Sequence, residues 1–195
     1  PPLHMRTRRG EFAAAESQLR HLEQAIRANG SQMLEAHLVY EKLRLAYAMR
    51  QTATMEHIAD EYQVLNLAER ALTGMENLLW ETTERRIMAA VLVLIHRGEI
   101  DKARRYMQQL QYLGVDQGYP IRFLPINLGL AYLDHLSGNI STAFRRLNDT
   151  LTQAAATGML TGLLDDIPGM ETFVRQAIDQ GRILVPQHAE RLLAT

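Results

Sequence analysis

A short pattern that begins with a glycine occurs three times in this chain and limits the folds it can adopt. In residues 138–151, GNISTAFRRLNDTL, an isoleucine follows the glycine by two positions, an alanine by five and a leucine by nine. The pattern also begins at Gly98 (GEIDKARRYM) and at Gly10 (GEFAAAESQL). Glycine ends a helix without a steric penalty, and alanine on the next helix allows a close approach. The pattern therefore predicts a series of two-helix repeats.

The spacing of the pattern predicts the length of each repeat. Gly98 and Gly138 are 40 residues apart, and the 88 residues between Gly10 and Gly98 leave room for two repeats of about 44. These repeats are longer than the tetratricopeptide repeat of about 34 residues but belong to the same class of helical pairs. We predict an all-α fold, an α-solenoid of antiparallel helical hairpins similar to a tetratricopeptide array, over residues 6–157. We interpret residues 1–5 as an expression scar.

Capping residues and apolar periodicity place the individual helices. Ser31 is the expected N-cap of a helix that reaches about Arg50, and a second helix is expected over about 55–72. Further helices are expected at about 76–96, with a break near 81–83, and at about 101–113, 125–137 and 138–157. Residues 158–195 are predicted to form helices at about 168–180 and 186–193 that cap the array as part of the same domain, because terminal repeats are commonly atypical.

The composition narrows the classes of function. The 195 residues carry a net charge of −1, which argues against a dedicated nucleic-acid or membrane surface. The longest apolar run, Ile87 to Ile95, is too short to span a bilayer and predicts a helix buried between its neighbours. The chain contains no cysteine, which fits a reducing compartment and leads us to expect a cytoplasmic protein.

No sequence motif for catalysis or for nucleotide binding is present. His57, Asp60 and Glu61 share one helix face, but we interpret them as a solvated charge cluster rather than as metal ligands. The arginine pairs 104–105 and 145–146 occupy similar positions in two repeats and are interpreted as solvated surface residues. We therefore expect a protein that is not an enzyme, with no catalytic residues, no metal and no cofactor.

The binding site is expected on the first helix of each hairpin, because the first helices line the concave face of a stacked array. The residues proposed for a ligand or partner are the polar and aromatic ones of these helices: Tyr40, Arg44, Tyr47, Trp80, Arg85, Arg122, Asn127 and Tyr132.

The tail resembles one family. Its order of residues is similar to the end of the repeat domain in large ATP-binding regulators of the LuxR family, of the maltose-activator type. The positions that match are Gly158, Leu164, Asp165, Gly169, Met170, Leu192 and Leu193. Two positions depart from the family: Ile167-Pro168 replaces its usual Gly-Pro order, and Phe173-Val174 stands where Leu-Leu is common.

The resemblance implies a sensor domain cut from a longer regulator, in which a separate module hydrolyses ATP and a helix-turn-helix outside this chain binds DNA. Such a domain would bind a small inducer or a protein partner on its concave face and control assembly, including self-association. The alternative is an adaptor, unrelated to transcription, that binds extended peptide segments in the same groove. Neither interpretation involves a membrane.

Overall fold

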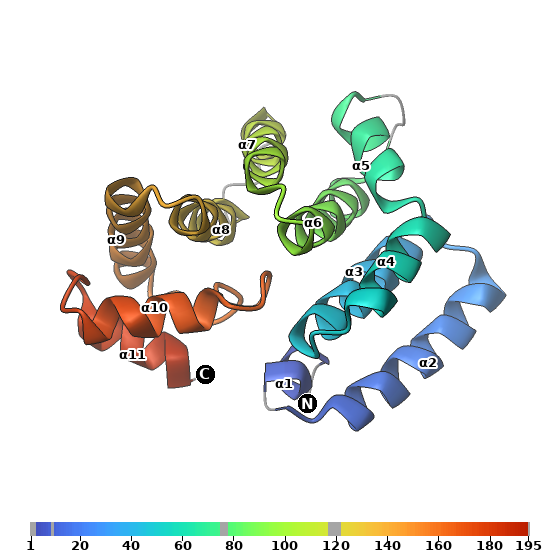
Figure 1. Cartoon of the computed structure of the whole chain (residues 1–195), viewed down its shortest axis with the longest axis horizontal. Helices are drawn as coiled ribbons and strands as arrows, with labels where there is room; N and C mark the ends of the chain where they lie inside the picture. The colour runs from blue at the N-terminus through green and yellow to red at the C-terminus, as the bar shows by residue number, and fades with distance from the viewer. Residues whose placement is uncertain (1–2, 9, 75–77, 117–121, 195) are drawn as a thin grey trace. The chain divides into compact units, whose positions relative to one another are not determined.

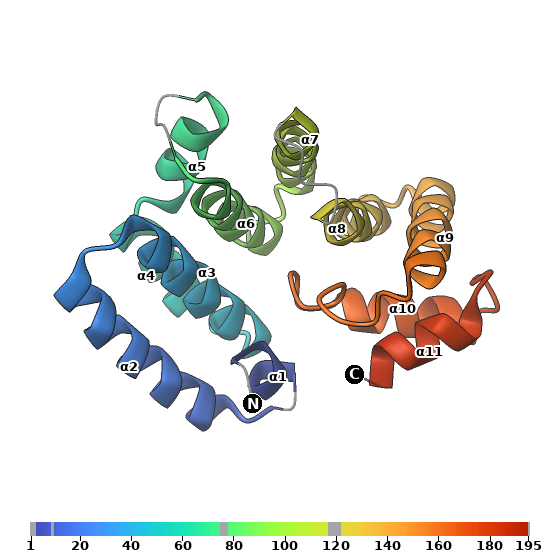
Figure 2. The ribbon, with the colours of Figure 1, turned by 180° about the vertical axis from the view of Figure 1, so that it is seen from behind.

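The computed structural model describes residues 3–8, 10–74, 78–116 and 122–194, and it is all-helical over these residues, as predicted. No β-strand occurs in these ranges (Figures 1 and 2). The helices are α1 (Leu3–Arg8), α2 (Phe12–Asn29), α3 (Gln32–Ala48), α4 (Thr52–Glu61), α5 (Val64–Leu72), α6 (Trp80–His96), α7 (Ile100–Asp116), α8 (Phe123–Leu136), α9 (Ile140–Thr157), α10 (Met170–Asp179) and α11 (Pro186–Ala194).

The chain divides into two compact units, Pro1–Glu99 and Ile100–Thr195, and the boundary falls inside the array predicted from the sequence. In the first unit, α3 packs against α2, α4 and α6, and α5 packs against α6. In the second unit, α8 packs against both α7 and α9, α10 contacts α8, and α11 contacts α9. Helices joined by short turns therefore form hairpins in each unit.

The three predicted turns share one backbone geometry. Gly10, Gly98 and Gly138 have φ values of 72°, 74° and 78°, in the left-handed region that glycine adopts without strain. In each turn the glycine N–H donates to the carbonyl three residues earlier, and the next N–H donates to the carbonyl five residues before it. These two hydrogen bonds form the Schellman closure of a helix end.

The alanine of each pattern is buried, as a close approach of helices would require. Ala15, Ala103 and Ala143 are all 0% exposed. The apolar residue four positions later is buried in every case: Leu19, Met107 and Leu147.

A turn of the same kind also occurs where the sequence has no glycine. Arg50 has a φ of 56° and closes its turn with the same two backbone hydrogen bonds. Met55, which is 1% exposed, takes the position of the alanine. The turns at Gly10, Arg50, Gly98 and Gly138 are therefore spaced by 40, 48 and 40 residues. The two equal repeats of about 44 predicted before Gly98 are wrong in their division.

Replacing Arg50 by glycine is expected to raise the free energy of unfolding by about 0.5–1 kcal/mol. A side chain in the left-handed region costs roughly 1–2 kcal/mol, and the greater freedom of glycine in the unfolded chain offsets part of the gain. Urea denaturation measures the change. Arg105→Gly, at an exposed position inside α7, is the control and should lose about 1 kcal/mol. A loss of stability in Arg50→Gly would contradict the strained turn.

The helix predicted over about 55–72 is two helices. It begins earlier, at Thr52, and breaks after Glu61, and the chain turns through Gln63 before α5 begins at Val64. Gln63 has a φ of 47°, the second strained position outside glycine among the described residues. The broken segment, residues 52–72, is 21 residues long against 17 in α7, so it holds part of the eight residues by which this repeat exceeds its 40-residue neighbours. No proline or glycine marks it in the sequence.

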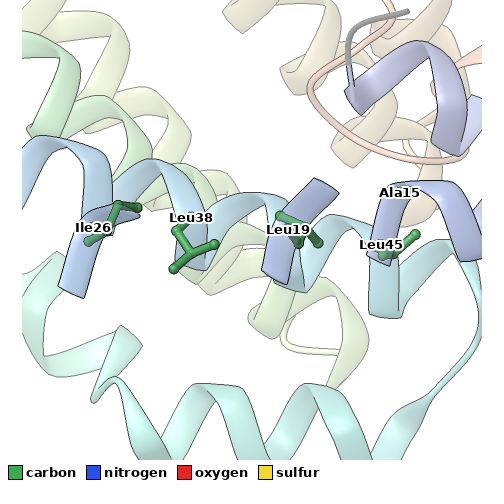
Figure 3. Close-up of a cluster of buried hydrophobic side chains, with 5 residues drawn as sticks. All are labelled: Ala15, Leu19, Ile26, Leu38 and Leu45. Atoms are coloured by element: carbon green, nitrogen blue, oxygen red, sulfur yellow. The ribbon is translucent and has the colours of Figure 1, made fainter. Parts of the chain in front are cut away.

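Apolar side chains from α2 and α3 form one core of the first unit (Figure 3). Ala15, Leu19 and Ile26 of α2 meet Leu38 and Leu45 of α3, and all five are at most 6% exposed. Their spacing follows the helical period, so each helix turns one apolar stripe toward the other. As predicted, Ser31 caps α3 by accepting a hydrogen bond from the N–H of Leu34.

Helix α6 is the most deeply buried helix of the first unit. Every residue from Ile87 to Ile95 is at most 8% exposed, as predicted for this apolar run, and α6 contacts α3, α4 and α5. The break predicted near residues 81–83 is wrong. Thr82 and Thr83 are buried inside the helix, so packing overrides their modest helix propensity. The start predicted at residue 76 lies outside the described residues, and α6 begins at Trp80.

The tail helices cover α8 and α9 within the second unit. Phe173 of α10 is 1% exposed, and its ring stacks on His135 with a centroid distance of 4.7 Å. It also lies 6.0 Å from the ring of Tyr132 and 5.9 Å from that of Phe144. Met170, Val174 and Leu192 of the tail helices are buried as well. Helix α7 continues through Gly114 to Asp116, beyond its predicted end, since a single buried glycine does not break a packed helix.

Candidate binding pocket

Five of the eight residues proposed from the sequence lie in α3 and α6, which pack on each other. Tyr40, Arg44 and Trp80 are 1%, 3% and 4% exposed, and Tyr47 and Arg85 are half-buried. The guanidinium of Arg85 lies over the ring of Tyr40, 4.8 Å from its centroid. Three of the five side chains are thus buried, and the role of all five in binding stays a prediction.

A buried ion pair accompanies them. Nη2 and Nε of Arg44 donate to one carboxylate oxygen of Glu41, at 2.7 and 3.1 Å, and Glu41 is 7% exposed. Buried charges persist in proteins only when they are paired in this way. The nearby His37 has its pKa lowered by burial and by the guanidiniums of Arg85 and Arg44, although Glu41 acts in the opposite direction.

The free energy of unfolding is expected to fall as the pH drops below about 6.5. We expect His37 to contribute to this dependence of stability on pH. Because the pKa of His37 is lower in the folded protein, the unfolded chain takes up the proton more readily. The native state is therefore favoured at higher pH and penalised as the pH falls below the unfolded pKa. Urea denaturation between about pH 7.5 and 5.5 should show a smaller slope in His37→Gln. The exposed His21→Gln is the control, and equal slopes in all three proteins would contradict this assignment.

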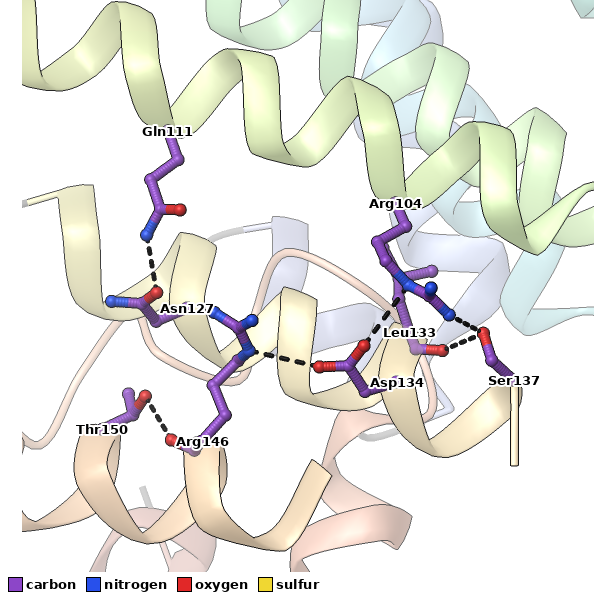
Figure 4. Close-up of polar contacts among 8 residues, drawn as sticks. All are labelled: Arg104, Gln111, Asn127, Leu133, Asp134, Ser137, Arg146 and Thr150. Carbon is purple, nitrogen blue, oxygen red and sulfur yellow. Dashed lines mark hydrogen bonds and ion pairs between the residues drawn. The ribbon is translucent and has the colours of Figure 1, made fainter. Parts of the chain in front are cut away.

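The other three proposed residues lie in the second unit and make contacts between its elements. Arg122, the residue before α8, pairs with Asp166 at 3.0 Å. Asn127 accepts a hydrogen bond of 2.7 Å from Gln111 of α7 (Figure 4). Tyr132 is 8% exposed and packs beside Phe173. These contacts join α8 and the residue before it to α7, to Asp166 and to α10. The binding role of the three residues stays a prediction.

Asp134 joins three helices of the second unit (Figure 4). Its carboxylate is 7% exposed and lies 3.3 Å from Nε of Arg104 in α7 and 3.2 Å from Nε of Arg146 in α9. Arg104 also donates to the hydroxyl of Ser137. The interpretation of Arg104 and Arg146 as solvated residues is therefore wrong, whereas their neighbours Arg105 and Arg145 are exposed.

A pocket of about 220 Å³ opens at the break between α4 and α5. One face of α3 supplies Gln32, Glu35, Ala36 and Val39, spaced as neighbours on a helix surface. The break itself and α5 supply residues 61–64 and Leu67, and α6 supplies Arg86 and Ala89. The strained Gln63 is part of this lining, and backbone strain outside glycine tends to occur at functional sites.

The pocket has an apolar floor and a polar rim. Ala36, Val39, Val64 and Ala89 are 2–7% exposed, whereas Gln32, Glu35, Glu61 and Gln63 are exposed. This division is typical of small-molecule sites, in which apolar surface provides affinity and a few polar groups fix orientation.

A second, more open groove of about 350 Å³ runs between α2 and α4 over α3. Its floor includes Leu19, Leu45, Ala46 and Ile58, and its walls carry charged residues of both signs. The charged and polar members are Glu16, Arg20, Glu23, Lys42, Gln51, Thr54, His57 and Glu61.

Lys42 connects the groove to the pocket. Its ammonium lies 3.0 Å from a carboxylate oxygen of Glu23 in α2 and donates to the hydroxyl of Tyr62 at 3.3 Å. Burial acts to lower the pKa of Lys42, but the hydrogen bonds with Glu23 and Tyr62 outweigh it and leave the pKa raised. Tyr62 lines the pocket and Lys42 lines the groove, so the two hollows share one polar contact.

The residues singled out as metal candidates do not assemble into a ligand set. His57 lies 3.7 Å from Glu61, and both are exposed. Over the described ranges, no group of three or more histidine, aspartate or glutamate side chains is placed to hold a metal ion. No described helix combines the length and apolar character needed to cross a membrane.

None of the eight residues proposed from the sequence lines the pocket or the groove. The pocket depends on the helix break at Gln63, and no proline or glycine in the sequence indicates this break. The available signal was the 88 residues between Gly10 and Gly98, eight more than two repeats of the 40 residues that separate Gly98 and Gly138, because an insertion within one repeat often forms a binding surface. No protein-family model, no curated protein and no solved structure matches this chain.

Proposed function

We propose that this chain is the non-catalytic sensor domain of a LuxR-family transcription regulator in the cytoplasm, binding a small inducer or a protein partner and so controlling assembly of the regulator. The observation that carries the binding role is the pocket at the α4–α5 break. It combines an apolar floor, a polar rim and a strained residue in the one repeat that is longer than its neighbours. A rigid packing role needs none of these features.

The tail supports the regulatory part of the proposal. Gly158 ends α9 in the left-handed conformation, and Gly169 stands before α10 with a φ of 105°. Met170 and Leu192 are at most 1% exposed, so residues that carry the resemblance build the cover of α8 and α9.

Two experiments test the proposal. The coding sequence on either side of residues 1–195 is expected to encode a nucleotide-binding loop upstream and a helix-turn-helix downstream. Thermal unfolding against a panel of metabolites is expected to show a raised midpoint with the inducer, since a ligand of the folded state adds stability with the logarithm of its excess. The proposal would be contradicted by flanking modules of another kind together with a thermal unfolding midpoint that no metabolite raises.

The second candidate function, a peptide-binding adaptor, is favoured by the groove between α2 and α4. It is larger and more open than the pocket and carries apolar and charged positions side by side, as a segment of another protein would require. Under this alternative, a partner segment should protect α2 and α4 from proteolysis and leave α5, which lines only the pocket, unaffected.

A further inference from the structure

We infer that the pocket between α3, α5 and α6 binds a small zwitterion with an apolar side chain, the chemistry of a free α-amino acid. This inference rests on the proposed sensor function and names the class of its inducer. Three features of the pocket favour such a ligand: its small size, its apolar floor and the charges of both signs around its rim.

The size favours a ligand of few atoms. The volume of about 220 Å³ lies below the range of roughly 300–1,000 Å³ usual for drug-sized ligands. The floor made by Ala36, Val39, Val64 and Ala89 is contributed by three helices and is buried. A short hydrocarbon side chain of a ligand can therefore be buried on this floor, away from water, while the charged end of the ligand remains at the exposed rim.

The negative side of the rim consists of Glu35 and Glu61. The side chain of Glu35 makes no hydrogen bond or ion pair with any residue in the described part of the chain. The contact of Glu61 with His57, at 3.7 Å, is an ion pair only when the imidazole is protonated. Both carboxylates are exposed at the rim and are therefore accessible to the ammonium of a ligand.

The positive side of the rim consists of Arg86 and the first turn of α5. Arg86 lines the pocket, is half-buried and takes part in an interaction within the chain. Gln63 is the N-cap of α5, and its side chain does not cap the helix. The N–H groups at the start of α5 are thus available to a carboxylate, and the partial positive charge of a helix N-terminus favours it.

Charges of both signs at one small rim discriminate between ligands. A simple cation would pair with Glu35 and Glu61 but would meet the field of Arg86 and of α5. A simple anion would have the opposite conflict. A zwitterion satisfies both sides at once, so each of its charges should strengthen binding.

The test is a titration followed by amide chemical shifts of the whole chain, using three probes with matched hydrocarbon bodies. Norleucine carries both charges, pentylamine lacks the carboxylate and hexanoate lacks the ammonium. We expect shifts in α3, α5 and α6, with norleucine binding about three- to fivefold more tightly than either singly charged probe, as expected for one exposed ion pair. The Glu35→Gln/Glu61→Gln variant should weaken norleucine and pentylamine by a similar factor and spare hexanoate.

The control variant is Glu81→Gln, at an exposed position of α6 outside the pocket, and it should change none of the three affinities. Pentylamine or hexanoate binding in the pocket as tightly as norleucine would overturn the inferred ligand class and leave the sensor function in place. An equal effect of Glu81→Gln on norleucine would overturn it as well. Absence of shifts in α3, α5 and α6 with all three probes would overturn the inference, and the metabolite panel would then decide the sensor function separately.

Discussion

Gly169→Ala is expected to lower the free energy of unfolding of the second unit by about 3 kcal/mol or more. Gly169 has a φ of 105°, which side-chain-bearing residues rarely adopt. An added Cβ would also overlap the Tyr132 hydroxyl and lie 3.0 Å from Cζ of the same ring. Tyr132 packs beside Phe173, so its ring has little room to move away. The expected loss combines roughly 1–3 kcal/mol of backbone strain with 1–3 kcal/mol of overpacking.

Urea denaturation followed by near-UV circular dichroism measures this loss through the packed aromatic side chains. Gly162→Ala is the matched control, because Gly162 also has a positive φ, 80°, but no atom lies within 4 Å of an added Cβ. The control should lose only the strain, roughly 1–2 kcal/mol. Equal losses in the two variants would show that the approach of Gly169 to Tyr132 does not matter.

Asp134→Ala is expected to cost the second unit about 3 kcal/mol. The substitution leaves Arg104 and Arg146 facing each other without the carboxylate that both now contact. Removing one partner of a buried ion pair costs about 3–5 kcal/mol, and the two arginine side chains are 21% and 29% exposed, which places this case at the lower end. Chemical denaturation at two salt concentrations gives the measurement, with a smaller loss expected at high salt.

Asp101→Ala is the control for this prediction. Asp101 also pairs with Arg104, at 3.5 Å, but its side chain is 80% exposed. An exposed pair contributes roughly 0–1 kcal/mol. A comparable loss in the two variants would contradict the view that Asp134 joins α7, α8 and α9.

The turns could be predicted from the sequence wherever glycine forms them. Gly10, Gly98 and Gly138 adopt a positive φ without strain because glycine has no Cβ. A glycine at these positions of the sequence therefore indicates the turn. Arg50 adopts the same geometry at a cost that the surrounding packing offsets, and no local signal reveals it. The division of the residues before Gly98 was wrong for this reason.

The candidate site was less predictable than the fold. Choosing polar and aromatic residues on the first helices selected Tyr40 and Arg44, which packing and ion pairing bury. The pocket instead arises where the second helix of one repeat breaks into α4 and α5, and α5 packs against α6. Glu35 and Glu61, taken singly, look like ordinary surface residues in the sequence.

Hydrogen–deuterium exchange of the whole chain tests the location of the site most directly. It should be measured with and without the compound that raises the unfolding midpoint most. The account predicts slower exchange in residues 61–67 and in the first turns of α3, which border the pocket, with exchange in α8 unchanged. Protection confined to α8, around Asn127 and Tyr132, would contradict it and would favour the residues proposed from the sequence.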